Sequence, residues 1–301
     1  MKNFFAKPYR WAGFFSILLA AAVAFTLLDT FELEKSITKV STTSIATGEE
    51  STVQASAPPN AVATNNSYQD ENIKITIDKV RKNDTNIYVA DIQISDVSYL
   101  KTALANDTYG RNIKDTTSSM AEAKKAIFAI NGDYYGFRNT GYVLRNGTVY
   151  RSSGNGEALV IDKEGNLSMV LESDVNMKSL SDKGAWQVLS FGPGLVENGQ
   201  IAVNNSSEVG QSMSSNPRTA IGQVSKLHYI IIVSDGRTSD NAGLSLLQLA
   251  QLFKEKGCTT AYNLDGGGSS TMYFNGKVIN NPTDGRKNGE REVSDIVYFG
   301  Y

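Results

Sequence analysis

Cysteine and histidine, the side chains that most often bind zinc, are nearly missing from the sequence. The 301 residues contain one cysteine, Cys258, and one histidine, His228. A lone cysteine cannot form an intrachain disulfide, and without a Cys/His cluster a structural zinc site is excluded. His228 stands in the apolar run 227–233, which predicts a buried strand and a structural rather than a catalytic histidine.

An excess of charge of one sign is also lacking. The chain has 29 Lys and Arg against 31 Asp and Glu, a formal net charge of −2 at pH 7. A balanced chain of this kind is not steered as a whole toward a polyanion, so no nucleic-acid partner is expected. The 41% hydrophobic content is enough to build a buried core.

One long apolar run is present near the N-terminus. Residues 11–28 carry no charge, with basic residues before them and acidic residues after them. At about 1.5 Å per residue such a helix barely crosses a hydrocarbon core of roughly 30 Å, and its basic flank stays cytoplasmic. We therefore expect a cytoplasmic tail (1–10), a single-pass signal anchor in the cell membrane (11–28) and an extracytoplasmic C-terminal domain. The alternative is a signal peptide cleaved after Ala22-Val23-Ala24.

The next segment, residues 29–68, predicts a disordered linker. It is rich in Ser, Thr and Ala, contains Pro58-Pro59, and has no aromatic side chain between Lys35 and Ser67. It therefore lacks the apolar surface that a folded segment must bury. The remaining residues, 69–301, are numerous enough for one large domain.

Alternating apolar and polar residues, separated by turn signals, characterise residues 69–301. Three hairpins are predicted, at 72–95, 142–151 and 158–171, and Asn146-Gly147 is a strong hairpin turn signal. No element is predicted in the variable-looking stretch 172–184. Further elements are a helix at 116–126 and strands at 127–130, 187–190, 199–203 and 219–223.

One helix pattern, at 244–256, lies between apolar strands at 228–233 and 260–264. Strand, helix and strand of these lengths predict a βαβ unit, and hence some parallel pairing. The expected fold class is α+β or mixed α/β. It is a mixed β-sheet with β-hairpins and at least one βαβ unit, in a single catalytic domain behind an N-terminal transmembrane helix.

Polar clusters occur where apolar strands end, at 131–133, 234–237 and 263–270, and where one begins, at 216–220. Open α/β sheets bind ligands at such ends, although an isolated Asp-Gly is usually a solvated turn. The three glycines after Asp265 allow something to approach the backbone, or the chain to adopt a positive φ. Peptide N–H groups of such a loop, with neighbouring serine hydroxyls, can bind an anion.

These motifs carry a resemblance to a family. The runs NPRTAIG (216–222), DGR (235–237) and NLDGGGSSTM (263–272), with the helix at 244–250 between them, are similar to the phosphodiester glycosidase family. NGDYY (131–135) and REVS (291–294) resemble its outer motifs, so the family motifs cover 127–301. Bacterial members are commonly membrane-anchored and linked with exopolysaccharide.

The resemblance implies a hydrolase that cleaves sugar-1-phosphodiester links of the N-acetylglucosamine-1-phosphate type in cell-surface or exopolysaccharide glycans. It would release the sugar and leave the phosphate as a monoester on the other partner. Two alternatives stay open: a catalytically silent glycan-binding or exopolysaccharide-assembly module, and a phosphodiesterase that cleaves the P–O bond. No oligomeric state is predicted.

Glycosyl transfer needs a carboxylate at the anomeric carbon and usually an acid at the leaving oxygen. Asp235 and Asp265, at the ends of two strands that are expected to be adjacent, are the candidates for that pair, and Asp133 could complete it or orient sugar hydroxyls. Glu292 is a weaker acid/base candidate. No cofactor or metal is expected, although the three aspartates could together bind Ca²⁺ or Mg²⁺.

Phosphate recognition needs positive charge, and guanidinium binds phosphate oxygens through two hydrogen bonds. Arg218 and Arg237 suit that role, unless they form structural ion pairs with the aspartates. Tyr134 and Tyr135 could stack on a sugar ring or pack inside the fold. The expected substrate- and phosphate-binding residues are Arg218, Arg237, Asn131, Asn263, Gly266, Gly267, Gly268, Ser269 and Ser270.

Overall fold

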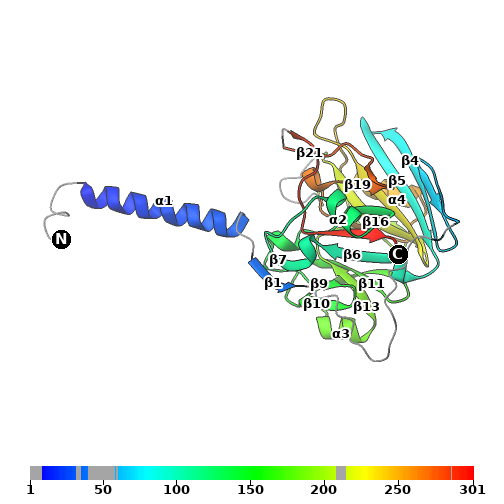
Figure 1. Ribbon diagram of the computed structural model, residues 1–301, viewed down its shortest axis with the longest axis horizontal. Coiled ribbons are helices and arrows are strands. Elements are labelled where there is room, and N and C mark those ends of the chain that lie inside the picture. The colour runs from blue at the N-terminus through cyan, green and yellow to red at the C-terminus, as the bar shows by residue number, and fades with distance from the viewer. Residues whose placement is uncertain (1–8, 32–34, 40–57, 59, 208–214, 286) are drawn as a thin grey trace.

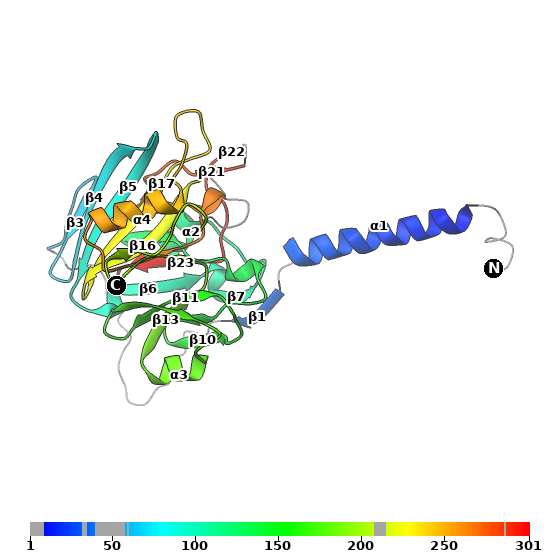
Figure 2. The ribbon, with the colours of Figure 1, turned by 180° about the vertical axis from the view of Figure 1, so that it is seen from behind.

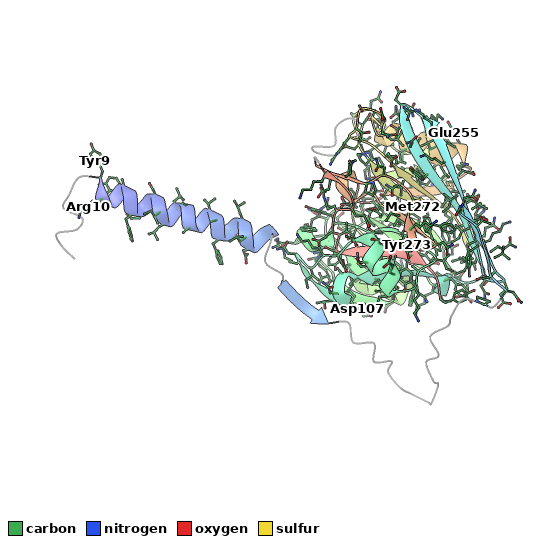
Figure 3. All side chains as sticks on the ribbon, turned by 45° about the horizontal axis from the view of Figure 1, so that its top comes forward. Tyr9, Arg10, Asp107, Glu255, Met272 and Tyr273 are labelled. Carbon is green, nitrogen blue, oxygen red and sulfur yellow. The ribbon has the colours of Figure 1, made fainter. Side chains whose placement is uncertain are left out.

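The computed structural model describes residues 9–31, 35–39, 58, 60–207, 215–285 and 287–301. Helix α1 (Arg10–Phe31) stands outside a body made largely of β-sheets (Figure 1). Its side chains project into open space, while those of the body are packed together (Figure 3). The segment Arg10–Asp29 has a mean hydropathy of 2.1 and none of it is buried, so it is long and apolar enough to cross a membrane. Most of the predicted tail, 1–10, lies outside the described residues.

The largest sheet has nine strands and forms one side of the body. In spatial order they are β15 (Gln200–Ile201), β14 (Gly194–Glu197), β18 (Thr260–Asn263), β16 (Arg218–Ser225), β17 (His228–Ser234), β5 (Thr85–Ile94), β4 (Ile73–Lys82), β3 (Ser67–Gln69) and β2 (Val62–Ala63).

Two sheets of five strands complete the body. One has the order β20 (Lys277–Val278), β19 (Met272–Phe274), β8 (Phe128–Asn131), β23 (Asp295–Phe299) and β6 (Leu100–Leu104). The other has the order β10 (Thr148–Arg151), β9 (Val143–Arg145), β13 (Ala185–Leu189), β11 (Glu157–Asp162) and β12 (Leu167–Leu171). Two small pairs are β1 (Lys35–Lys39) with β7 (Thr108–Arg111), and β21 (Thr283–Asp284) with β22 (Lys287–Asn288).

The main apolar core lies where the three large sheets meet. Ile92 and Ile231 of the nine-stranded sheet, Phe128 and Phe299 of the second sheet, and Leu159 of the third are fully buried in it. Because strand side chains alternate between faces, each sheet also has an outer face, which is covered where its residues are apolar.

Helices cover these outer faces. α4 (Leu246–Glu255) packs on the nine-stranded sheet through residues such as Phe253 (Figure 2). α2 (Thr117–Ala123) covers the second sheet and α3 (Met177–Asp182) the third. Each helix covers part of one sheet, while outward-facing residues of β4 and β10 stay exposed.

Most predicted elements are present. The hairpin at 72–95 is confirmed as β4 and β5, which pair over ten positions, and the other two predicted hairpins are also formed. The predicted helices are confirmed as α2 and α4, and α4 begins with a capping box between Ser245 and Gln248. His228, which was predicted to be buried and structural, is partly exposed on β17, and its Nε2 lies 2.9 Å from Oδ1 of Asp91 on β5. The helix α3 lies in the stretch where none was predicted.

The predicted parallel pairing is wrong. β17 and β18 run in the same direction and α4 connects them, but β16 lies between them and pairs antiparallel with both. Every strand pair among the described residues is antiparallel. The antiparallel strand β17 is covered by a helix on one face and by the core on the other. Its sequence is therefore an uninterrupted apolar run, which is the pattern typical of parallel strands.

The predicted linker, 29–68, is not free of regular structure. β1 pairs with β7, and β2 pairs with β3 at the edge of the nine-stranded sheet. The parts 32–34, 40–57 and 59 lie outside the described residues. A polar segment can pair with the edge of an existing strand through backbone hydrogen bonds, without burying apolar side chains. Strand pairing of this kind is therefore not predictable from the composition of the segment.

Candidate active site

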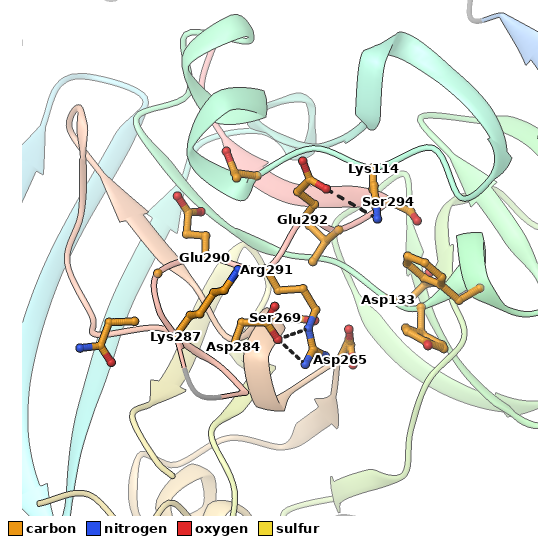
Figure 4. A pocket seen from close by; sticks show the side chains of 16 residues that line it. Lys114, Asp133, Asp265, Ser269, Asp284, Lys287, Glu290, Arg291, Glu292 and Ser294 are labelled. Carbon is orange, nitrogen blue, oxygen red and sulfur yellow. Dashed lines mark hydrogen bonds and ion pairs between the residues drawn. The ribbon is translucent and has the colours of Figure 1, made fainter. Parts of the chain in front are cut away.

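A cavity of about 600 Å³ lies where the end of β8, the end of β18 and the start of β23 come together (Figure 4). Its lining is strongly charged and carries both signs. The lining residues are Lys114, Thr116, Asp133, Tyr134, Phe137, Asp265, Ser269, Asp284, Lys287, Asn288, Gly289, Glu290, Arg291, Glu292, Val293 and Ser294.

Asp265 is one of two buried carboxylates that line this cavity, with 9% of its surface exposed. The backbone holds it from both sides: its N–H donates to Gly132 O (3.3 Å), and its carbonyl accepts from Asn131 Nδ2 (2.6 Å). Its Oδ1 accepts from Gly266 N at 2.9 Å. Burial raises the pKa of Asp265 to about 6. The nearby Ser269 hydroxyl and the charge of Arg291 lower that pKa in part.

The glycine loop after Asp265 packs its backbone against the guanidinium of Arg291. Gly267 has φ +63°, a conformation that side chains with a Cβ rarely adopt. A Cβ added at Gly268 would lie 2.7 Å from Cζ of Arg291 and 2.7 Å from Oδ1 of Asp284. The glycine at 268 therefore leaves the room that the Arg291 side chain occupies.

Asp133 is buried at the side of the same cavity and is fully engaged. Arg145, on β9, donates from Nη2 to Asp133 Oδ2 at 2.7 Å and from Nε to Asp295 Oδ2 at 2.8 Å. Asp133 also accepts from the backbone N–H of Tyr135 (2.9 Å) and of Ser190 (3.0 Å). Burial raises the pKa of Asp295 to about 7, against the opposing effect of the Arg145 charge. This carboxylate–guanidinium–carboxylate group ties the two five-stranded sheets together beneath the cavity.

The rim of the cavity carries ion pairs that are half exposed. Arg291 reaches Asp284 Oδ1 with Nε at 2.8 Å and with Nη2 at 2.6 Å. Glu292, whose side chain is 53% exposed, lies 3.7 Å from Lys114 Nζ. The rim therefore offers cationic groups that an anionic ligand can reach from solvent.

Comparison with known proteins assigns the family. The sequence pattern of the phosphodiester glycosidase family matches residues 124–300, more than half of the chain. The chain belongs to the phosphodiester glycosidase family. It is 33% identical over 202 residues to the SPbeta prophage-derived uncharacterized protein YomE of Bacillus subtilis (strain 168), covering 64% of this chain and 31% of that protein. It is 32% identical over 127 residues to mouse N-acetylglucosamine-1-phosphodiester alpha-N-acetylglucosaminidase, covering 37% of this chain and 24% of that protein.

A solved structure of similar fold comes from zebrafish. It is the catalytic domain of N-acetylglucosamine-1-phosphodiester alpha-N-acetylglucosaminidase auto-inhibited by its pro-peptide, with a TM-score of 0.60 and 22% identity, covering 76% of this chain and 83% of that chain. At that identity the likeness shows the fold. The chain spans about a third of the length of the bacterial relative and about a quarter of the mouse protein, so the similarity concerns one part of those longer proteins.

In this phosphodiester glycosidase family member, four of the residues expected from sequence line one cavity: Asp133, Asp265, Ser269 and Glu292. Among the expected glycines, Gly268 packs against the rim residue Arg291. The hydroxyl of Ser270 is buried and, within the described residues, has no hydrogen-bond partner. Tyr135 is buried in the fold, and half-buried Tyr134 lines the cavity.

Asp235 does not line this cavity. Its Oδ1 accepts from Asn281 N at 2.8 Å, and its Oδ2 lies 3.4 Å from Asn86 Nδ2 and 3.5 Å from Tyr88 Oη. Burial raises the pKa of Asp235. The structure therefore does not place it beside Asp265 in one cavity, because β16 separates the two strands that carry them.

The two expected arginines also lie away from the lining. Arg218 is 3% exposed and donates from Nε to Leu244 O at 2.9 Å. Arg237 is exposed, donates to Asn216 Oδ1 at 3.1 Å and lies against Gly267.

The expected asparagines act on the backbone. Asn131 accepts from Thr219 Oγ1 at 2.8 Å besides holding Asp265, and Asn263 donates to Gly192 O at 2.8 Å. Both are fully buried, and neither lines the cavity.

The sequence reasoning missed the lining residues Lys114 and Arg291, and also Arg145 and Asp295, which form ion pairs beneath the cavity. Arg291 stands in an outer motif of the family resemblance, next to Glu292, and its motif position was the available signal. Lys114, Arg145 and Asp295 lie outside any polar strand-end run, apart from the adjacency of Asp295 to that same motif. No group of three or more His, Cys, Asp or Glu that could hold a metal ion occurs in the described part of the chain.

Proposed function

We propose that this protein is an extracytoplasmic, membrane-anchored hydrolase that cleaves the bond between the anomeric carbon and the phosphate oxygen of a sugar-1-phosphodiester. The family membership supports the reaction class, and the mouse and zebrafish relatives are named for that activity on N-acetylglucosamine. The apolar helix α1 supports the anchor. A cell-surface or exopolysaccharide glycan is the substrate class that fits this location.

The observation that carries the proposal is the position of Asp265. It is a buried carboxylate with a pKa of about 6, and among the described residues no cation lies within ion-pair distance of it. It lines one cavity with the arginine of the rim. At neutral pH the carboxylate is mostly ionised and can stabilise, or attack, an anomeric carbon that becomes positively charged in the transition state.

The phosphate is bound in this proposal by Arg291 and Lys114 at the rim. Both line the cavity, and each already faces a carboxylate at the surface, Asp284 and Glu292 respectively. When a phosphodiester enters, each cation exchanges its carboxylate partner for a phosphate oxygen. The loss of one ion pair is therefore compensated by the formation of another. Arg218 and Arg237 lie outside the cavity lining and take no direct part in this proposal.

A strong proton donor at the leaving oxygen is not required. A phosphate monoester has its second pKa near 6, so it leaves readily once its charge is neutralised. Asp133 is held by Arg145 and two backbone N–H groups, and it acts as a wall of the cavity. Glu292, exposed at the rim, is the carboxylate that can take a proton from the attacking water.

Product identification tests the proposal. The detergent-solubilised full chain is incubated with UDP-N-acetylglucosamine and a panel of glycosyl-1-phosphodiesters, with Asp265→Asn as the inactive control. Release of the sugar by wild type alone supports the proposal. Release of a sugar-1-phosphate identifies a P–O-cleaving phosphodiesterase, and binding without turnover identifies a glycan-binding module.

A further inference from the structure

The end of the anchor helix is attached to the body by two separate contacts. The carbonyl of Asp29, in the last turn of α1, accepts from Nδ2 of Asn112 at 3.4 Å. β1 then pairs antiparallel with β7, from Lys35 opposite Arg111 to Lys39 opposite Thr108. Only residues 32–34 lie between α1 and β1, and a connection of that length spans at most about 15 Å.

The segment that receives these contacts continues directly into the cavity wall. Lys114 lines the cavity and follows Asn112 by two residues, so their Cα atoms are at most about 7 Å apart. Asp115 is then joined to Val293 by two backbone hydrogen bonds of 3.0 and 2.8 Å, and Val293 lines the same cavity. Folded structure thus connects the anchor to the lining of the cavity.

If residues 29–68 were a disordered linker, the distance between the cavity and the membrane would be larger and variable. Forty flexible residues have an end-to-end distance of roughly 35 Å, which would let a domain reach glycans well above the membrane. With β1 paired to β7, the chain between β1 and β2 joins two points of the same body and adds nothing to the height of the cavity. Figures 1 and 2 both show α1 leaving the body on the side where β1 and β7 lie.

We propose that the pairing of β1 with β7 holds the active site at the membrane surface, and that the substrate is a sugar-1-phosphodiester whose other alcohol is a lipid of the same membrane. This rests on the proposed function and specifies its substrate class. Confinement of enzyme and substrate to one surface raises their effective concentration, and a short tether makes that gain largest.

The reaction on such a substrate is balanced by water alone. The hydroxyl of water bonds to the anomeric carbon, and the bond between that carbon and the phosphate oxygen breaks. The proton passes to the phosphate monoester, which stays on the lipid while the sugar leaves. The rim cations Lys114, Lys287 and Arg291 lie on the cavity lining where that charged headgroup would bind.

The test uses the full chain in lipid vesicles and two insertions of the same length. A flexible Gly/Ser linker of about twenty residues is inserted either between Glu32 and Leu33, before β1, or between Thr47 and Gly48, after β1. Each protein is assayed on an N-acetylglucosamine-1-phosphodiester of a long-chain lipid in the same vesicles, and on the same headgroup carried by a short water-soluble alcohol.

The insertion before β1 is expected to lower the rate on the lipid-borne substrate about tenfold, because effective concentration falls with tether length, and to leave the rate on the soluble substrate unchanged. The insertion after β1 should change neither rate. An equal effect of both insertions, or an unchanged or faster rate after the first, overturns the inference while hydrolysis of the soluble substrate still supports the proposed function. Absence of hydrolysis of both substrates by wild type overturns the proposed function itself.

Discussion

Replacing Asp265 with asparagine should stabilise the fold while it removes activity. Burial raises the pKa of this carboxyl from 3.8 to about 6, so the folded state binds its proton more tightly than the unfolded state does. Stability therefore decreases as the pH rises through the window from 3.8 to about 6, and the loss is complete above it. At 1.36 kcal/mol per pKa unit the full loss is about 3 kcal/mol.

Asparagine carries no charge, and its side-chain oxygen can still accept the hydrogen bond from Gly266 N. Asp265→Asn should therefore be more stable than wild type by about 3 kcal/mol at pH 7.5 and by only about 1 kcal/mol at pH 4.5. The free energy of unfolding is measured by urea titration of the detergent-solubilised full chain at both pH values. Asn288→Ala is the matched control, because it alters the lining of the same cavity without removing a titrating group.

Activity should change in the opposite direction. The kcat of Asp265→Asn should fall by at least about 100-fold, equivalent to roughly 2.7 kcal/mol of barrier. The kcat/KM of wild type should fall as the pH drops below about 6, since the reaction needs the ionised carboxylate. A variant that is no more stable at pH 7.5 than at pH 4.5, relative to wild type, would refute the burial argument. One that keeps more than about a tenth of wild-type kcat would refute the catalytic role.

Three further substitutions test the surroundings of the site. Gly268→Ala places a Cβ 2.7 Å from the Arg291 guanidinium and should lower kcat/KM about tenfold in steady-state kinetics. Gly156→Ala is the control and should leave kcat/KM unchanged, because its Cβ would meet only one oxygen, at 3.7 Å. Arg145→Ala leaves two buried carboxylates unpaired and should lower the free energy of unfolding by roughly 3–5 kcal/mol, measured by urea titration. Arg291→Lys should raise KM for a sugar-1-phosphodiester more than for an aryl glycoside, whereas the control Arg237→Lys should change both KM values alike. If Arg291→Lys leaves the ratio of the two kcat/KM values as it is in wild type, its guanidinium does not bind the phosphate.

Elements defined by local pattern were predictable from the sequence. The hairpin of β4 and β5 follows from alternating side chains around a short polar turn, and α4 from its apolar spacing and its cap. Strand order was not predictable in this way. The apolar run of β17 has the composition of a buried strand whether its neighbours are parallel or antiparallel, and only the position of β16 decides between them.

The same limit explains which site residues were found. Asp265 and Ser269 belong to one contiguous run, so a single motif identifies both. The pairing of Asp235 with Asp265 assumed that their strands are neighbours, but the intervening β16 puts the two strand ends about 10 Å apart. Arg145 contacts Asp295, which lies 150 residues away along the chain, and no local pattern reports such a contact.

The two buried aspartates of the cavity show why burial alone does not identify a catalytic group. Asp133 has an arginine and two backbone N–H groups as partners, so its charge is compensated and its oxygens are occupied. Asp265 accepts one backbone hydrogen bond from its own loop and has no ion-pair partner in the described part of the chain. An uncompensated buried charge destabilises a fold, so selection for stability alone would replace it with a neutral residue. We therefore propose Asp265, which is costly to keep charged and is open to the cavity, as the catalytic carboxylate.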